Sequence, residues 1–119
     1  MKIEQIKNIL DAKVLCCEDL LDSEVCSACG SDMMSDVLAY VKDQGILLTG
    51  LVNPQTVRTA MMMDMKGIVF VRGKTPDENI ISLARDNDIV VLTTDYRLYT
   101  ACGLLYHAGL FTEGSDKVE

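Results

Sequence analysis

Ile68-Val69-Phe70-Val71-Arg72-Gly73 leads into Thr75-Pro76, so an apolar run rich in β-branched residues meets a small turn and then a helix-start signal. The same order recurs where residues 46–50 lead to Asn53-Pro54 and where residues 89–94 lead to Asp95. Short runs of this kind, alternating with helical patterns, are typical of βα units that form a parallel sheet. The sequence therefore predicts an α/β fold with a parallel-rich central sheet of four to five short strands flanked by helices.

The N-terminal part supplies two further helices and two further strand candidates. The first helix has an apolar face made by Ile3, Ile6, Ile9 and Leu10. The strand candidates are residues 14–17 and 25–29. The second helix is capped by Ser31 or Ser35 and ends at Gly45. Its predicted inner face is Met34, Val37, Leu38 and Val41.

Two prolines and one aspartate mark the starts of the later helices. Asn53 and Thr75 are predicted caps, because each precedes a proline and can satisfy an amide that has no partner in the helix. Lys66-Gly67 is predicted to close the first of these helices. The last helix is predicted to start at Asp95.

Length and charge limit the function classes. The 119 residues predict a single domain at 1–111 and a disordered acidic tail at 112–119. A net charge of −7 and the lack of a Lys/Arg cluster disfavour a nucleic-acid surface. The apolar runs fall far short of the roughly 20 residues that cross a membrane. The N-terminus lacks an apolar signal region, so a cytoplasmic location is expected.

No complete catalytic constellation is recognisable. Gly73-Lys74-Thr75 is similar to the end of a phosphate-binding P-loop, but Ile68 stands where that motif needs its first glycine. His107, the single histidine, has no recognisable partner for acid–base work. We therefore expect no enzyme activity and no cofactor.

The cysteines allow two interpretations. Cys26-Ser27-Ala28-Cys29 has the CxxC spacing, yet one such pair without a second pair or a spaced histidine is a weak metal or redox signal. Free cysteine also packs well in strands. We expect the five cysteines to be reduced, mostly buried and free of metal.

A ligand site is predicted where the strands end, because ligands of parallel sheets bind at the carboxyl edge. Glycines there let a ligand approach the backbone, hydroxyl groups offer donors and acceptors, and Arg and Lys suit an anion. An ion pair with an acidic residue is the alternative role of Arg72. The candidate residues are Gly30, Ser31, Asp32, Thr49, Gly50, Arg72, Gly73, Lys74, Thr93 and Thr94.

Surplus apolar surface predicts self-association. The helical patterns already fill the core-facing positions with other residues, and a domain of this length has limited interior. The apolar side chains left over are Met62, Met63, Tyr99 and Tyr106. We expect a two-fold homodimer.

Three stretches together resemble the DRTGG-domain family, which is similar to the N-terminal domain of bacterial HPr kinase/phosphorylase. They are residues 28–38, Leu48-Thr49-Gly50 and residues 69–74, and the resemblance covers about Met1 to Phe111. The resemblance implies an α/β regulatory or ligand-sensing module that is often fused to other domains and often dimeric. This chain has Leu51-Val52 in place of the family's Asp-Arg, and Arg72-Gly73-Lys74 in place of its Thr-Gly-Gly.

These observations predict a non-catalytic regulatory or ligand-sensing domain that binds a small anionic ligand, phosphate- or nucleotide-like, or a partner protein. Two alternatives stay open. One is a redox or metal-binding accessory protein that uses Cys26 and Cys29, and the other is an oligomeric scaffold without a ligand.

Overall fold

A computed structural model describes residues 1–40 and 45–110 of the chain. Its helices are α1 (Ile3–Ile9), α2 (Met34–Tyr40), α3 (Pro54–Met62), α4 (Glu78–Asp86) and α5 (Leu98–His107), with a short 3₁₀ helix, η1 (Glu18–Leu20). Its strands are β1 (Lys13–Cys16), β2 (Ser27–Gly30), β3 (Gly45–Thr49), β4 (Gly67–Phe70) and β5 (Val90–Thr93).

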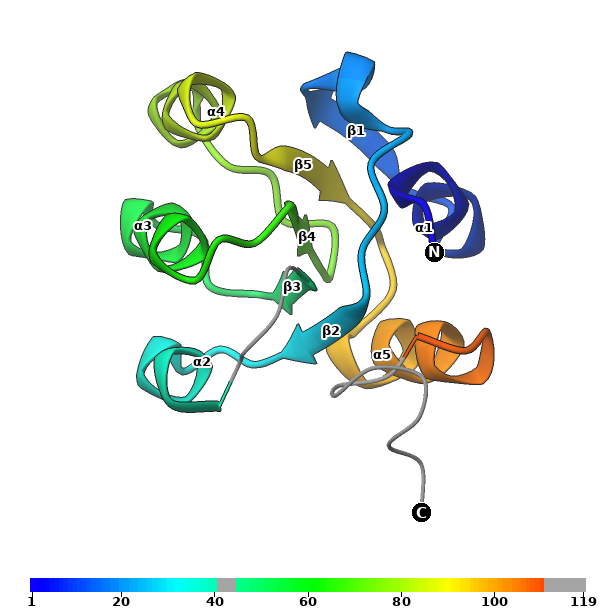
Figure 1. Cartoon of the computed structure of the whole chain (residues 1–119). Coiled ribbons are helices and arrows are strands. Elements are labelled where there is room, and N and C mark those ends of the chain that lie inside the picture. Colours follow the sequence, from blue (N-terminus) through cyan, green and yellow to red (C-terminus); the bar gives the residue numbers. More distant parts are fainter. Residues whose placement is uncertain (41–44, 111–119) are drawn as a thin grey trace.

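The strands form one sheet in the order β1-β5-β4-β3-β2. Strands β2 to β5 are parallel, whereas β1 pairs with β5 in the antiparallel sense. Helices α2, α3 and α4 cover one face of the sheet, and α1 and α5 cover the other (Figure 1). The predicted α/β architecture is therefore confirmed.

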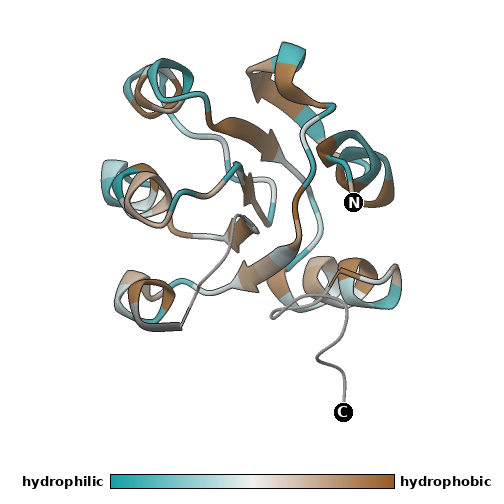
Figure 2. Ribbon diagram, viewed as in Figure 1, coloured by the Kyte–Doolittle hydropathy of each residue, from teal (hydrophilic) through white to brown (hydrophobic). Residues whose placement is uncertain are grey.

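Two apolar layers hold the sheet between its helices. Side chains on β3 and β4 are buried on both faces, as expected for central strands of a parallel sheet. Figure 2 shows this apolar centre and the polar outer faces of the helices. Phe70 and Leu47 point into the layer under α2, α3 and α4, while Leu48 and Val69 belong to the layer under α1 and α5.

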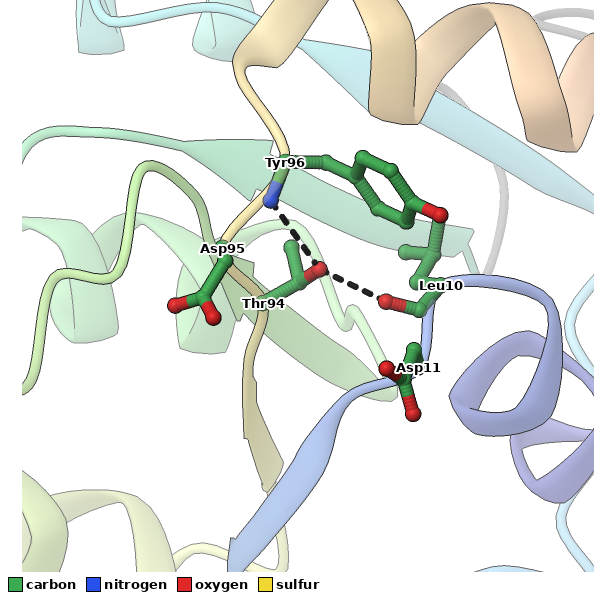
Figure 3. Close-up of a pocket in the computed structure, with 5 residues that line it drawn as sticks. All are labelled: Leu10, Asp11, Thr94, Asp95 and Tyr96. Carbon is green, nitrogen blue, oxygen red and sulfur yellow. Dashed lines mark hydrogen bonds between the residues drawn. The ribbon is translucent and has the colours of Figure 1, made fainter.

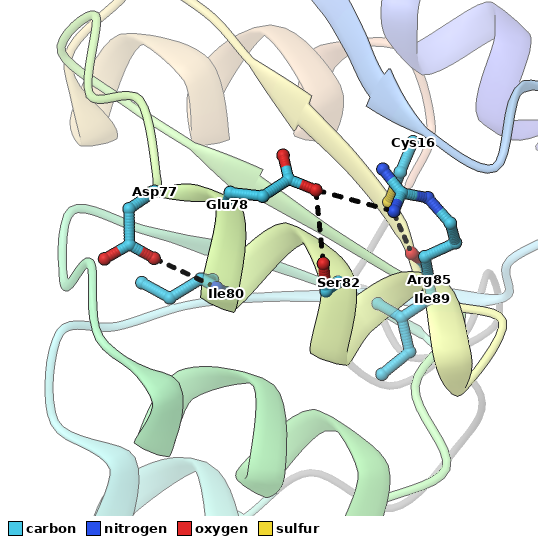
Figure 4. Close-up of polar contacts among 7 residues, drawn as sticks. All are labelled: Cys16, Asp77, Glu78, Ile80, Ser82, Arg85 and Ile89. Atoms are coloured by element: carbon cyan, nitrogen blue, oxygen red, sulfur yellow. Dashed lines mark hydrogen bonds and ion pairs between the residues drawn. The ribbon is translucent and has the colours of Figure 1, made fainter.

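The helix starts agree with the sequence at one of three positions. The Asn53 side chain accepts a hydrogen bond from Gln55 N at 2.8 Å, as predicted for a cap. The prediction for Thr75 is wrong, because Asp77 caps α4 by accepting from Ile80 N at 3.0 Å (Figure 4). Arg85 Nη1 lies 3.7 Å from Glu78 Oε2, two turns away on α4, and such an exposed ion pair contributes little to stability (Figure 4).

The prediction that the last helix starts at Asp95 is also wrong. Helix α5 begins at Leu98, and its cap residue Arg97 makes no side-chain capping bond. The preceding residues are held elsewhere, because Gly73 N donates to Thr94 O and Arg72 N donates to Tyr96 O, both at 2.8 Å. This backbone pairing holds residues 94–96 beside the turn after β4 and outside the helix.

Several other boundaries differ from the sequence predictions. Helix α3 ends at Met62, and Gly67 opens β4 instead of closing the helix. The two N-terminal strands lie at Lys13–Cys16 and Ser27–Gly30. Leu38 is 39% exposed, since Met34 and Val37 fill the inner face of the short helix α2. Val41 and residues 112–119 lie outside the described residues.

One buried hydroxyl group has no hydrogen-bond partner within the described residues. It is Oγ1 of Thr59 on α3, whose side chain is fully buried. Because an unpaired buried hydroxyl is unfavourable, Thr59→Val is expected to raise the free energy of unfolding by about 1 kcal/mol. Thr56→Val is the matched control, expected to lower it by about 1 kcal/mol, because Thr56 Oγ1 donates to Leu51 O at 2.7 Å. Urea unfolding of both variants measures the two signs, and a loss of stability in both would contradict the prediction.

Candidate functional site

The carboxyl ends of β2, β3, β4 and β5 meet at one edge of the sheet. Because β1 is antiparallel, its first residue lies at this edge too, with Lys13 opposite Thr93. The site residues predicted from the sequence all follow or end these strands. The structure joins most of them by direct contacts.

Asp32 fastens the end of β2 to the end of β3. Its Oδ1 accepts hydrogen bonds from Thr49 Oγ1 at 3.0 Å and from Gly50 N at 2.7 Å. Thr49 is fully buried, and its Oγ1 accepts in turn from Leu51 N at 3.1 Å. Just before Asp32, Ser31 Oγ accepts from Met33 N at 3.0 Å and shapes the turn into α2. Asp32 is therefore a structural member of the edge.

Arg72 lies in the turn after β4, where both it and Gly73 have left-handed backbone conformations, with φ of +61° and +68°. Such a conformation is unfavourable for arginine but easy for glycine. The Arg72 guanidinium covers Gly50 so closely that a Cβ atom there would overlap Nη2. In residues 1–40 and 45–110 the ion pair present is Arg85–Glu78, so Arg72 has no carboxylate partner there.

The hydroxyl groups of Thr93, the last residue of β5, and of Thr94, which follows it, are engaged by backbone carbonyls. Thr93 Oγ1 donates to Lys74 O, and the buried Thr94 Oγ1 donates to Leu10 O, each at 2.7 Å. The sequence reading, in which these groups offer donors to a ligand, therefore needs correction. Thr94 Oγ1 also accepts a hydrogen bond from Tyr96 N at 3.4 Å (Figure 3).

Two neighbouring cavities open at this edge. The first has a volume of about 260 Å³ and contains Thr94 Oγ1 in its wall (Figure 3). Its lining is Leu10, Asp11, Thr94, Asp95 and Tyr96. The second, of about 380 Å³, is lined by Asp11, Lys13, Leu15, Gly73, Thr75, Thr93 and Asp95.

Asp11, Asp95 and Tyr96 are site residues that the sequence reasoning missed. The sequence predicts a helix start at Asp95. In the structure its carboxylate lies beside Gly73, and Oδ1 would be 3.1 Å from a Cβ atom added to Gly73. Asp11 precedes β1 and has a left-handed φ of +48°. Only the antiparallel pairing of β1 with β5 brings Asp11 to this edge.

Comparison with known proteins identifies the family of this chain. The model of the DRTGG domain matches residues 5–108. The chain belongs to the DRTGG-domain family. No curated protein matches it. This DRTGG domain is also similar to the CBS and DRTGG domains of the regulatory region of Clostridium perfringens pyrophosphatase, solved in complex with the activator diadenosine tetraphosphate. The TM-score is 0.70 at 20% identity, and the match covers 98% of this chain and 49% of that chain. This likeness shows the fold.

The five cysteines of the DRTGG domain are free thiols, but the expectation that most are buried is wrong. Cys16 is buried and donates to Ile89 O at 3.4 Å (Figure 4). Cys26 is exposed because it precedes β2. The remaining three are half-buried: Cys17, Cys29 and Cys102.

Thiol chemistry is disfavoured at these half-buried cysteines. Burial raises the pKa of Cys29 and of Cys102, with smaller effects from Asp36 on Cys29 and from Cys29 on Cys102. Burial and then the neighbouring Cys16 raise the pKa of Cys17 to about 12. A raised pKa lowers the thiolate fraction, which is the nucleophilic and metal-binding form. Across residues 1–40 and 45–110 no group of three or more His, Cys, Asp or Glu side chains could hold a metal ion.

None of the helices in the part of the chain that the structure describes is long and apolar enough to cross a bilayer.

Proposed function

We propose that this DRTGG domain is a non-catalytic regulatory module, located in the cytoplasm, that binds a small anionic ligand at the carboxyl edge of its sheet. The observation that carries the proposal is the position of Arg72. Its guanidinium lies over Gly50 and has no carboxylate partner in the described part of the chain. An exposed guanidinium with free donors can bind phosphate or carboxylate in a bidentate manner.

The family relationship supports a regulatory role. The similar pyrophosphatase region contains a DRTGG domain and is regulatory, and it is complexed with a nucleotide activator. This chain matches about half of that region. We therefore propose ligand sensing as the role of this DRTGG domain, and we do not extend the pyrophosphatase activity to it.

The redox or metal-binding alternative has less support. Cys29 is half-buried with a raised pKa, whereas its CxxC partner Cys26 is exposed outside the strand. A reactive pair needs at least one thiol with a lowered pKa. The anionic-ligand proposal has the exposed Arg72 and Lys74 of the turn after β4 in its support.

Replacing Arg72 with alanine tests the proposal. If the guanidinium makes a charged hydrogen bond to the ligand, Arg72→Ala weakens binding by about 1.5–3 kcal/mol, roughly 10- to 100-fold. The side chain is exposed, so the fold is expected to persist. Calorimetric titration with phosphate, pyrophosphate, adenosine phosphates and diadenosine tetraphosphate measures the effect.

Arg58→Ala is the matched control for Arg72→Ala. Arg58 is an exposed arginine on α3, so the control removes the same charge away from the turn after β4. The wild type and Arg58→Ala are expected to bind alike. Equal loss in the two variants, or no binding of any anion to the wild type, would contradict the proposal.

We also propose that the domain forms a two-fold homodimer through the outer face of α5. Tyr99 on this helix is 91% exposed and borders a shallow hollow of about 640 Å³ that also includes Leu104. Exposed aromatic side chains of this kind are enriched in interfaces. Met62, at 69% exposure, lies on α3 under the opposite face of the sheet, and Met63 is half-buried against the core, so neither joins this surface.

Light scattering is expected to give the dimer mass for the wild type at high micromolar concentration. Tyr99→Glu should give the monomer mass, because it places a charge in the interface. Met62→Glu, with the same change on α3, should remain dimeric. A wild-type monomer at this concentration would rule out the dimer.

A further inference from the structure

We infer that Gly50 is a positioning residue, whose lack of a side chain lets the Arg72 guanidinium lie in a fixed place at the carboxyl edge. The inference rests on the proposed anion-binding function and adds to it the residue that places its cation. It follows from two independent observations, which are the space around Gly50 and the backbone conformation of Arg72.

The backbone at Gly50 does not itself require glycine. Its φ is negative, whereas the glycines with positive φ among the described residues are Gly73 and Gly109. A residue with a Cβ atom could therefore adopt this φ. Gly50 is buried, and its N–H donates to Asp32 Oδ1 at 2.7 Å, so the peptide is fixed from the side of β2. What excludes a side chain at position 50 is the space that it would occupy.

The Arg72 guanidinium fills the space on the side-chain face of Gly50. A Cβ atom on Gly50 would overlap Nη2 of Arg72, and would lie 3.0 Å from Cζ and 3.1 Å from Nε. The three atoms nearest to that position thus all belong to one guanidinium. The guanidinium lies where the side chain of any other residue at position 50 would begin.

The backbone of Arg72 is held in a conformation that arginine rarely adopts, with φ of +61°. Val71 N donates to Thr49 O at 3.0 Å, and Arg72 N donates to Tyr96 O at 2.8 Å. These bonds fix the turn to the end of β3 on one side and to the residues after β5 on the other. Residues in such unfavourable conformations persist where the surrounding structure enforces them, and they cluster at functional sites.

An arginine held in this way binds an anion at a lower entropic cost. The ordering of long side chains is one of the main costs of association, and it is lower when the side chain is already restricted. The uncharged Gly50 backbone restricts the guanidinium without neutralising it, and in the described residues Arg72 has no carboxylate partner. A methyl group at position 50 would displace the guanidinium, because the end of a long side chain moves more easily than the backbone.

A double-variant cycle with Gly50→Ala tests this role. Gly50→Ala is expected to weaken the binding of phosphate, pyrophosphate and adenosine phosphates about 3- to 10-fold in calorimetric titration, because the displaced guanidinium must then be ordered on binding. In the Arg72→Ala background, Gly50→Ala should cause no further loss of affinity, because the atoms that meet the new methyl group are absent. Urea unfolding checks that each variant is folded.

The order of the guanidinium is measured separately, with no ligand present. The heteronuclear NOE of the Arg72 Nε–Hε group reports its motion on the picosecond to nanosecond timescale, and Arg72→Lys assigns its signal. This NOE should be high in the wild type and should fall in Gly50→Ala to the value of Arg58. Arg58 is an exposed arginine on α3, so it serves as the internal reference in both proteins.

The failures are distinguishable. A wild-type NOE for Arg72 as low as that of Arg58, or an NOE that Gly50→Ala leaves unchanged, would overturn the positioning role. Equal loss of affinity on Gly50→Ala with and without the Arg72 side chain would also overturn it, because Gly50 would then act through the fold of the loop alone. A fall in the NOE, with no anion bound by the wild type, would support the positioning role and overturn the anion-binding function.

Discussion

Phe70→Ala is expected to lower the free energy of unfolding by about 3–5 kcal/mol. Phe70 is fully buried at the end of β4, and its ring packs in the layer under α2, α3 and α4. Removing it deletes apolar contacts and leaves a cavity that rigid strands on both sides cannot close. Domains of this size are stable by about 5–15 kcal/mol, so this loss is a large share of the total stability.

Urea unfolding followed by circular dichroism measures this loss. Met62→Ala is the control, because it also truncates a large apolar side chain but at a site that is 69% exposed. The control should change the stability by no more than about 0.5 kcal/mol. Phe70→Leu, which keeps most of the volume, should lie between the two. Equal effects at Phe70 and Met62 would contradict the burial of the ring.

The central strands could be predicted because their burial leaves a local signal. Strands β3, β4 and β5 are covered on both faces, so they read as continuous apolar runs. The parallel order also follows locally, since each strand is followed by a helical pattern before the next strand. The same reasoning predicted that Asp32, Thr49 and Arg72 lie at the carboxyl edge of the sheet.

The position of β1 could not be read in this way. The residue pattern of 13–16 does not indicate which strand β1 pairs with. The pairing with β5 also includes an irregularity between Val14 and Cys16. The choice of β5 as neighbour depends on the whole packed sheet. The sequence therefore does not indicate Asp11 as a site residue, although Asp11 lies just before β1.

Helix starts were misplaced where tertiary bonds compete with local caps. Thr75 and Asp95 both have side chains suited to capping, but the chain around them is bound to a neighbouring loop. Thr93 Oγ1 donates a hydrogen bond to Lys74 O, and Gly73 N donates one to Thr94 O. These bonds between the ends of β4 and β5 delay the start of both following helices, and they leave Asp95 free to face the cavities.

Asp32→Ala is expected to lower the free energy of unfolding by about 3 kcal/mol. One carboxylate oxygen accepts from both Thr49 Oγ1 and Gly50 N, at 3.0 and 2.7 Å, and hydrogen bonds to a charged group contribute about 1.5–3 kcal/mol each. Thr49 is fully buried, so its hydroxyl group depends on this carboxylate as its hydrogen-bond acceptor.

Asp36→Ala is the matched control for this prediction. Asp36 is an exposed aspartate in the first turn of α2, and its removal changes the net charge by the same amount. It should lower the stability by no more than about 0.5 kcal/mol. Asp32→Asn keeps an acceptor oxygen without the charge, so its loss should be intermediate, about 1–2 kcal/mol. If urea unfolding gives the same small change for Asp32→Ala and Asp36→Ala, then Asp32 does not fasten β2 to β3, and the carboxyl edge depends on the strand pairing alone.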